Sequence, residues 1–540
     1  MNVLANSNAS LISEASQPRP SRSWRPAVEL LAVFCLLAAT SAGALWWCHQ
    51  NGYLLHYGDA VAHLNIARRI VDSRTPGYDQ IGTVWLPLPH ALALPLVRHD
   101  ELWRTGLAGA IPAAAAFILA GCFLFAAVRR LFSSSAAGFT AVLLLVSNPN
   151  LLYLQSIPMT ETVFFAAFFA LAYFTVRYRE RQSAWTALGA GLAVLAGTLT
   201  RYEGWFLIPF VGLYLLFAGR RRVLPALIFW AIASAGPLYW LAHNWYYYAD
   251  PLEFYHGPSS AKAIYERALA SGMQRYRGDG EWGNAARYFL AAVRLVSGYG
   301  LAACGVLGSV VLVWKRRWWP LVLFLLPSVF YVISMYSGGT PIFVPDLWPF
   351  SYYNTRYGLA ALPLLALGGA ALAAAAPRRF QIAASAAVVC LALAPWLAAG
   401  SRESWVCWKE SQVNSEVRRA WTQEAAEFLN AHYHGGGIIA SFGDLTAIFL
   451  EAGIPLRETL HSGNSPHWPA SLLRPDLFLW EEWAVTYSGD PVATAILRAQ
   501  RSGPRYECVK MIALKGAPVI EIYQRHRDES SVFQGARRGQ

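Results

Sequence analysis

The sequence has little charge for its length. Asp, Glu, Lys and Arg make up 14% of the 540 residues, whereas hydrophobic residues make up 55%. Soluble globular domains average about 25% charged residues, which cover their surfaces. The composition therefore excludes an ordinary soluble protein and indicates a membrane protein.

The sequence also lacks the cysteine and histidine spacings of a zinc site. None of its seven cysteines forms a CxxC motif or a Cys/His cluster. Two of them, Cys407 and Cys508, lie in the polar C-terminal part and could pair if that part faces an oxidising space. Four others lie in apolar segments, where a small buried residue is the usual role: Cys35, Cys122, Cys304 and Cys390.

No nucleic-acid-binding motif is present, although the formal net charge is +12. The positive residues gather in short clusters between apolar segments, which is the pattern that orients helices in a bilayer. We therefore attribute the positive net charge to contact with membrane lipid, and we expect no nucleic-acid partner.

Long apolar segments dominate the rest of the chain. A helix of about 20 apolar residues crosses the hydrocarbon core of a bilayer. The sequence predicts about eleven such helices, at 27–48, 105–128, 137–154, 158–178, 184–200, 203–219, 223–245, 289–314, 318–336, 357–376 and 380–399.

The positive clusters predict how these helices are oriented. With eleven spans, every cluster falls on one side of the membrane, as the positive-inside rule requires. The N-terminus is then cytoplasmic and the C-terminal part lies outside a bacterial-type inner or cell membrane. The clusters lie within 19–25, 129–130, 177–181, 220–222, 315–317 and 378–379.

The chain divides into three predicted parts. Residues 1–26 are polar and rich in Ser, Pro and Arg, which predicts a disordered cytoplasmic tail. Residues 27–399 form an all-α polytopic membrane bundle. Residues 400–540 form a small extracytoplasmic α/β domain. Three outside loops are predicted, at 49–104, 246–288 and 337–356.

The α/β prediction for the C-terminal part rests on alternating patterns. A helix is predicted near 414–433, a strand at 438–442 and a helix at 443–452. Irregular proline-rich chain is predicted to follow, up to a closing strand at 519–523.

The first outside loop carries the most informative pattern. Asp59 and His63 are four residues apart, so they share one face of a predicted amphipathic helix on the membrane surface. A carboxylate at a helix N-terminus can be a cap, and it can equally be a reactive group. The spacing leaves both interpretations open.

Further ionisable and aromatic residues stand at outside ends of spans. Ionisable groups at membrane depth cost roughly 2.5–3.5 kcal/mol each, so they are usually paired or functional. An ion pair that fastens two helices is one interpretation, and a phosphate site built on planar guanidinium groups is another. The residues are Glu161, Arg201, Tyr202, Glu203, Arg356 and Tyr357.

These features together resemble the GT-C superfamily of membrane glycosyltransferases. The resemblance covers about 27–399 and is greatest to bacterial protein mannosyltransferases, the aminoarabinose transferase of lipid A and galacturonosyltransferase-like (Rgt-type) enzymes. It is carried by Asp59 on the loop helix with its Ile66-Ala67-Arg68 run, Pro87-Leu88-Pro89-His90, Met159-Thr160-Glu161 and Thr200-Arg201-Tyr202-Glu203-Gly204.

The resemblance implies an inverting enzyme that moves a sugar from a polyprenyl-phosphate carrier to a glycan, lipid or protein acceptor at the outer membrane face. It implies that Asp59 is the catalytic base and that Arg201 and Arg356 hold the carrier phosphate. The remaining residues expected to bind substrate are His63, Glu161, Tyr202, Glu203 and Tyr357.

One departure from the family concerns a second carboxylate. Many relatives have Asp-Glu in the first loop, where this chain has Asp59-Ala60. His63 or Glu161 could substitute for that carboxylate, or no metal is used. The sequence reveals no required cofactor and leaves room for a divalent metal.

Two rival functions fit a polytopic chain. One is a transporter or flippase of a lipid-linked glycan, and the other is a non-catalytic scaffold whose C-terminal part binds a partner. Transporters often contain internal repeats and midplane charges. The absence of a repeat and the position of charges at outside ends favour the enzyme.

Overall fold

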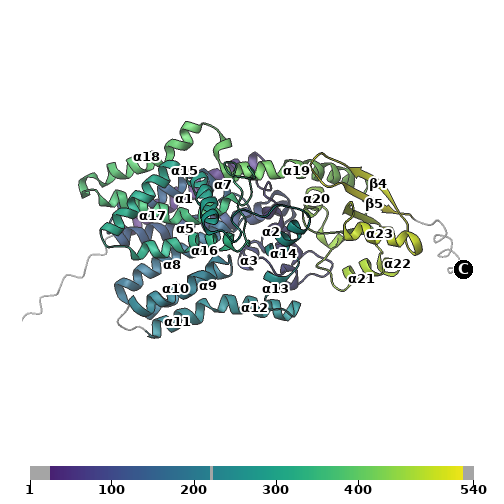
Figure 1. Cartoon of the computed structure of the whole chain (residues 1–540), viewed down its shortest axis with the longest axis horizontal. Coiled ribbons are helices and arrows are strands. Elements are labelled where there is room, and N and C mark those ends of the chain that lie inside the picture. The colour runs from purple at the N-terminus through teal and green to yellow at the C-terminus, as the bar shows by residue number, and fades with distance from the viewer. Residues whose placement is uncertain (1–24, 219–222, 527–540) are drawn as a thin grey trace, which may run out of the picture.

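The computed structural model describes residues 25–218 and 223–526. A helical bundle occupies one end of the elongated molecule and a small mixed sheet occupies the other (Figure 1). The predicted tail at 1–26, apart from its last two residues, and the positive cluster at 220–222 lie outside the described residues.

Each of the eleven predicted spans coincides with a helix or with two consecutive helices. Their apolar composition and low charge explain why they pack into one bundle. The helices are α1 (Arg25–Gln50), α5 (Leu107–Phe132), α6 (Ser135–Val146), α7 (Pro149–Gln155), α8 (Glu161–Arg181), α9 (Ala184–Thr198), α10 (Glu203–Ala218), α11 (Val223–Ala233), α12 (Ala235–Tyr248), α15 (Trp282–Trp314), α16 (Trp319–Tyr336), α17 (Leu362–Ala375) and α18 (Gln381–Ala399).

Not all of these helices are long enough to cross a membrane. Within 25–218 and 223–526, seven helical segments are long and apolar enough, or eight if the bent pair α6 and α7 is one span. That pair bends by 72° because Pro149 begins a new helix, which the Asn148 side chain caps. The count of eleven stays a prediction.

Small residues bring the bundle helices close together. A Cβ atom added to Gly308 of α15 would lie 1.7 Å from the carbonyl oxygen of Gly368 in α17. The two backbones therefore touch, as they do in membrane interfaces built from glycine and alanine. This contact holds α17, and the short helix η2 (Thr355–Ala361) before it, against α15.

The predicted loop at 49–104 folds between the bundle and the sheet (Figure 1). It contains α2 (Gly58–Arg69), η1 (Tyr78–Ile81), α3 (Leu88–Ala93) and α4 (Asp100–Thr105). Leu64 and Ala67 of α2 are buried with Trp421 and Leu445 of the C-terminal part. The apolar face of this helix is thus covered by protein, where the sequence predicted contact with the membrane surface.

The C-terminal part contains a five-stranded sheet in the order β2-β1-β3-β5-β4. Strand β1 pairs in parallel with β2 and β3, whereas β5 pairs antiparallel with β3 and β4. The elements are α19 (Val406–His432), β1 (Ile438–Ala440), α20 (Thr446–Ala452), β2 (Thr459–Leu460), α21 (His467–Leu473), α22 (Pro475–Phe478), β3 (Trp483–Tyr487), α23 (Pro491–Ser502), β4 (Tyr506–Ile512) and β5 (Ile520–Arg525).

Two expectations for this part are wrong. The stretch predicted as irregular chain contains three strands, β2, β3 and β4, and three helices. Most of β4 is exposed, so the strand lacks an apolar pattern that could reveal it. The possible disulfide between Cys407 and Cys508 does not form either: both thiols are free, and Cys407 is buried whereas Cys508 is exposed.

Candidate active site

Charged side chains from the bundle, the first loop and the C-terminal part meet at one place. Asp59 stands in the first turn of α2, Glu161 begins α8, and Glu203 begins α10. Arg201 lies between α9 and α10, and η2 carries Arg356. With Glu410 of α19, these residues form what we call the charged cluster: Asp59, Glu161, Arg201, Glu203, Arg356 and Glu410.

Arg356 is the centre of the cluster. Its Nη2 atom binds Oδ2 of Asp59, its Nε lies 3.2 Å from Oε1 of Glu161, and its Nη1 lies 3.8 Å from Oε1 of Glu410. The Arg356 side chain is 6% exposed, whereas that of Asp59 is 41% exposed. Asp59 therefore forms the open edge of a buried ion-pair network.

Arg201 is held deeper in the same network. Its Nε donates to Oε1 of Glu203 at 2.7 Å, and its Nη1 lies 3.1 Å from Oε1 of Glu161. Its Nη2 donates to the hydroxyl of Tyr331 at 2.5 Å, and Tyr331 in turn donates to Glu203 at 3.0 Å. Glu161 thus bridges Arg201 and Arg356 with a single oxygen atom.

Aromatic rings cover both guanidinium groups. The ring of Tyr357 lies 5.0 Å from the Arg356 guanidinium and 5.6 Å from that of Arg201, and it stacks on Tyr331. These contacts fix the planes of the two forks. A cavity of about 10 Å³, enough for roughly one water molecule, opens beside them. It is lined by Glu161, Phe164, Phe165, Arg201, Glu203, Tyr331, Arg356, Tyr357, Leu359 and Ala360.

Glu410 is the member of the cluster that sequence reasoning missed. Its carboxylate accepts hydrogen bonds from the backbone N–H groups of Asn354, at 3.0 Å, and Thr355, at 2.7 Å. Burial raises the pKa of Glu410, while Arg356 and the bonds from Thr355 and Asn354 act to lower it. Nothing in the polar sequence of α19 distinguishes this residue from a surface carboxylate.

His63 lies beside the cluster and is neutral at pH 7. Burial lowers its pKa to about 3, and the charges of Arg356 and Arg201 act in the same direction. Its Nδ1 atom lies 3.0 Å from Nε2 of His90, and its ring packs on Trp85 at 4.2 Å. His63 therefore offers a neutral hydrogen-bonding group and no charge.

Tyr202 points away from the cluster. Its hydroxyl donates to the carbonyl of Val84 at 2.7 Å, and its ring stacks on Phe254 at 5.2 Å. Tyr202 is one of the eight site residues predicted from the sequence. Its contacts are with neighbouring loops, so its role in the structure is packing between them.

The cluster is rich in carboxylates, but in the part of the chain that the structure describes they are not placed as a metal site. Among the described residues, no group of three or more His, Cys, Asp or Glu side chains is placed to hold a metal ion. The carboxylates of Asp59, Glu161 and Glu410 are instead directed at one guanidinium. The arrangement suits arginine-based binding of an anion.

Comparison with known proteins agrees with the resemblance found in the sequence. Residues 103–247 match the family described as dolichyl-phosphate-mannose-protein mannosyltransferase. This segment contains Glu161, Arg201 and Glu203. The match confirms the predicted resemblance to GT-C glycosyltransferases.

Solved structures are among the matches. A crystal structure of the Archaeoglobus fulgidus oligosaccharyltransferase, in complex with zinc and sulfate, has 13% sequence identity and a TM-score of 0.45. The alignment covers 84% of this chain and 68% of that chain. A search of curated proteins finds no match.

Proposed function

We propose that this integral membrane glycosyltransferase of GT-C type transfers a sugar, with inversion, from a polyprenyl-phosphate carrier to a glycan, lipid or protein acceptor. The reaction takes place at the extracytoplasmic face of a bacterial-type cell membrane. The observation that carries the proposal is the pairing of a partly exposed carboxylate, Asp59, with a buried guanidinium, Arg356.

Asp59 is the proposed general base. A carboxylate within hydrogen-bond reach removes the proton of an acceptor hydroxyl as its oxygen attacks the anomeric carbon. The bond between that carbon and the phosphate oxygen breaks, and the lipid phosphate leaves with the electron pair. Attack opposite the phosphate inverts the anomeric centre.

Arg356 and Arg201 are the proposed phosphate ligands. Charge that develops on the leaving phosphate is stabilised by fixed guanidinium groups in a site shielded from water. Glu161, Glu203 and Tyr357 orient these groups through the contacts already described. His63 supplies a neutral hydrogen-bonding group near the sugar, and Tyr202 braces the adjacent loop.

The charge balance of the cluster suggests an order of events. Four carboxylates surround two guanidinium groups, so an added phosphate competes with these carboxylates for the arginines. Asp59 is the most exposed of the four carboxylates and is therefore the easiest to displace. Donor binding would thus release Asp59 from Arg356 and make it available as a base.

The first test is a transfer assay with purified protein and a panel of polyprenyl-phosphate sugars. We expect the wild type to release lipid phosphate and Asp59→Asn to be about 100-fold slower, because the amide cannot accept the proton. The matched control is Asp476→Asn, which removes a carboxylate paired with Arg474 in the C-terminal part.

Transfer retained by a correctly inserted Asp59→Asn protein would contradict the assignment of the base. The absence of release with every donor, together with movement of a lipid-linked glycan across vesicles, would replace the enzyme with a transporter.

A further inference from the structure

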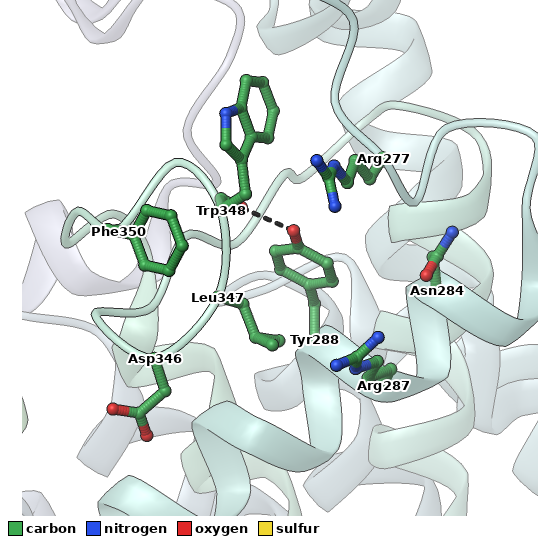
Figure 2. Close-up of a pocket in the computed structure, with 8 residues that line it drawn as sticks. All are labelled: Arg277, Asn284, Arg287, Tyr288, Asp346, Leu347, Trp348 and Phe350. Atoms are coloured by element: carbon green, nitrogen blue, oxygen red, sulfur yellow. Dashed lines mark hydrogen bonds between the residues drawn. The ribbon is translucent and has the colours of Figure 1, made fainter.

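A second pocket lies between the start of α15 and the loop at 346–350 (Figure 2). Its volume is about 260 Å³, whereas that of the cavity at the charged cluster is about 10 Å³. Basic and aromatic side chains face each other across it in Figure 2. The lining residues are Arg277, Asn284, Arg287, Tyr288, Asp346, Leu347, Trp348 and Phe350.

The pocket carries uncompensated positive charge. Within the described ranges, neither Arg277 nor Arg287 has a carboxylate within ion-pair distance. The one acidic lining residue, Asp346, is bound by Arg294. This contrasts with the charged cluster, where carboxylates contact both guanidinium groups. The guanidinium of Arg277 lies 5.1 Å from the centre of the Trp348 ring, which leaves its N–H groups, like those of Arg287, available to an anion.

Aromatic side chains of the loop also line the pocket, and the ring of Trp348 packs against Arg277. The hydroxyl of Tyr288 donates to the carbonyl of Trp348 at 2.5 Å and ties the loop to α15. Phe350 is 68% exposed and has a φ of 57°, a left-handed conformation that costs energy for a residue with a side chain. The electron-rich face of an aromatic ring attracts the C–H groups of a sugar ring.

The pocket lies on the same side of the bundle as Arg356. Tyr288 precedes Ala292 by one turn of α15, and a Cβ atom added to Gly358 would lie 2.6 Å from the carbonyl carbon of Ala292. Gly358 is two residues beyond Arg356 in η2. The loop at 346–350 leads directly into the segment that Glu410 holds.

We propose that this pocket binds an anionic sugar, one that carries a phosphate or a carboxylate, and that it holds the acceptor during transfer. Arg277 and Arg287 bind the anionic group, Trp348 orients Arg277, and the exposed ring of Phe350 contacts the sugar ring. The acceptor role rests on the proposed function, whereas the binding itself does not.

The test measures binding to the full chain in detergent, with no donor present. The probes are glucose 6-phosphate, glucuronate and uncharged glucose. We expect at least one anionic sugar to bind tighter than glucose, and Arg287→Gln to weaken that binding by about tenfold. The control is Arg267→Gln on α14 (Ala261–Ala270), an exposed arginine outside the pocket, which should change binding less than about twofold.

A second variant separates the sugar from its charge. Phe350→Ala removes an exposed ring and so spares the fold. The substitution should weaken the binding of the anionic sugar and leave the binding of inorganic phosphate unchanged. The binding of phosphatidylglycerol is measured in nanodiscs for the wild type and for Arg287→Gln. If the substitution weakens the binding of this lipid and leaves the binding of the sugars unchanged, the pocket is a lipid-headgroup site and the proposal is overturned. An equal effect of Arg267→Gln would also overturn it.

The acceptor role has its own readout. If transfer is measured, Arg287→Gln should raise the KM for an anionic acceptor and leave donor affinity unchanged. A KM that does not change would remove the acceptor role while the binding result stands. The absence of any transfer would count against the proposed function alone.

Discussion

Glu161 shows how a single residue can support both a structural and a functional interpretation. One of its oxygen atoms lies 3.1 Å from Arg201 and 3.2 Å from Arg356. The helix-fastening ion pair considered from the sequence therefore exists, and it is part of the same network that contains Asp59. The two interpretations differ in the effect they predict for a substitution that removes the planar guanidinium of Arg201 but keeps its positive charge.

We predict that Arg201→Lys weakens donor binding by about tenfold, because a lysine cannot bind a phosphate with a planar fork. The charge stays, so Glu161 and Glu203 keep a cationic partner. Arg201→Ala would be uninformative, because breaking a buried pair costs about 3–5 kcal/mol in stability. Donor affinity and the thermal midpoint in detergent, measured side by side, check the prediction.

The matched control is Arg474→Lys, whose exposed pair with Asp476 lies far from the cluster in the chain. If Arg201→Lys lowers the thermal midpoint and leaves donor affinity intact, the residue fastens helices and does not bind phosphate.

Helix α19 is the element that joins the C-terminal part to the site. It runs from the bundle towards the sheet (Figure 1), and near its start Glu410 accepts two backbone hydrogen bonds from the segment before Arg356. Arg418 of the same helix donates a hydrogen bond to the backbone carbonyl of His56 at 2.6 Å. His56 precedes Asp59 by three residues. The C-terminal part therefore completes the site and is not merely attached to it.

We predict that Glu410→Gln lowers the rate of transfer by roughly tenfold, because η2 loses a charged acceptor and Arg356 shifts relative to Asp59. Glu416→Gln, an exposed residue on the same helix, is the control. Turnover and donor KM are measured for both variants. Equal turnover of the two proteins would show that Glu410 does not position Arg356.

At the scale of the whole molecule, the side on which the site lies depends on the predicted orientation. Cys508 offers a natural reporter because it is exposed on β4, whereas Cys407 is buried. Burial, followed by the charge of Glu521, raises the pKa of the Cys508 thiol, so labelling is slow at pH 7 and faster at pH 8.

We predict that a membrane-impermeant maleimide labels Cys508 from the outside of intact cells. The Cys508→Ser protein should lose the label, which identifies the thiol. Labelling only after the membrane is opened would place the C-terminal part, and with it the charged cluster, on the cytoplasmic side.

The sequence by itself determined the helical membrane bundle and most of the charged cluster. Long apolar segments require helices because backbone groups find no water in hydrocarbon. Ionisable residues at the ends of such segments are few and costly, so Asp59, Glu161, Arg201 and Arg356 stood out before any contact was known.

Only the tertiary structure decided how these residues pair and which others join them. Glu410 lies in a polar helix and binds Thr355 of η2, which is 55 residues away in the chain, and no local pattern records such a contact. The pocket of Arg277 and Arg287 likewise depends on a loop folding back over α15. Local sequence sets which segments enter the membrane, whereas contacts between distant segments set the geometry of the site.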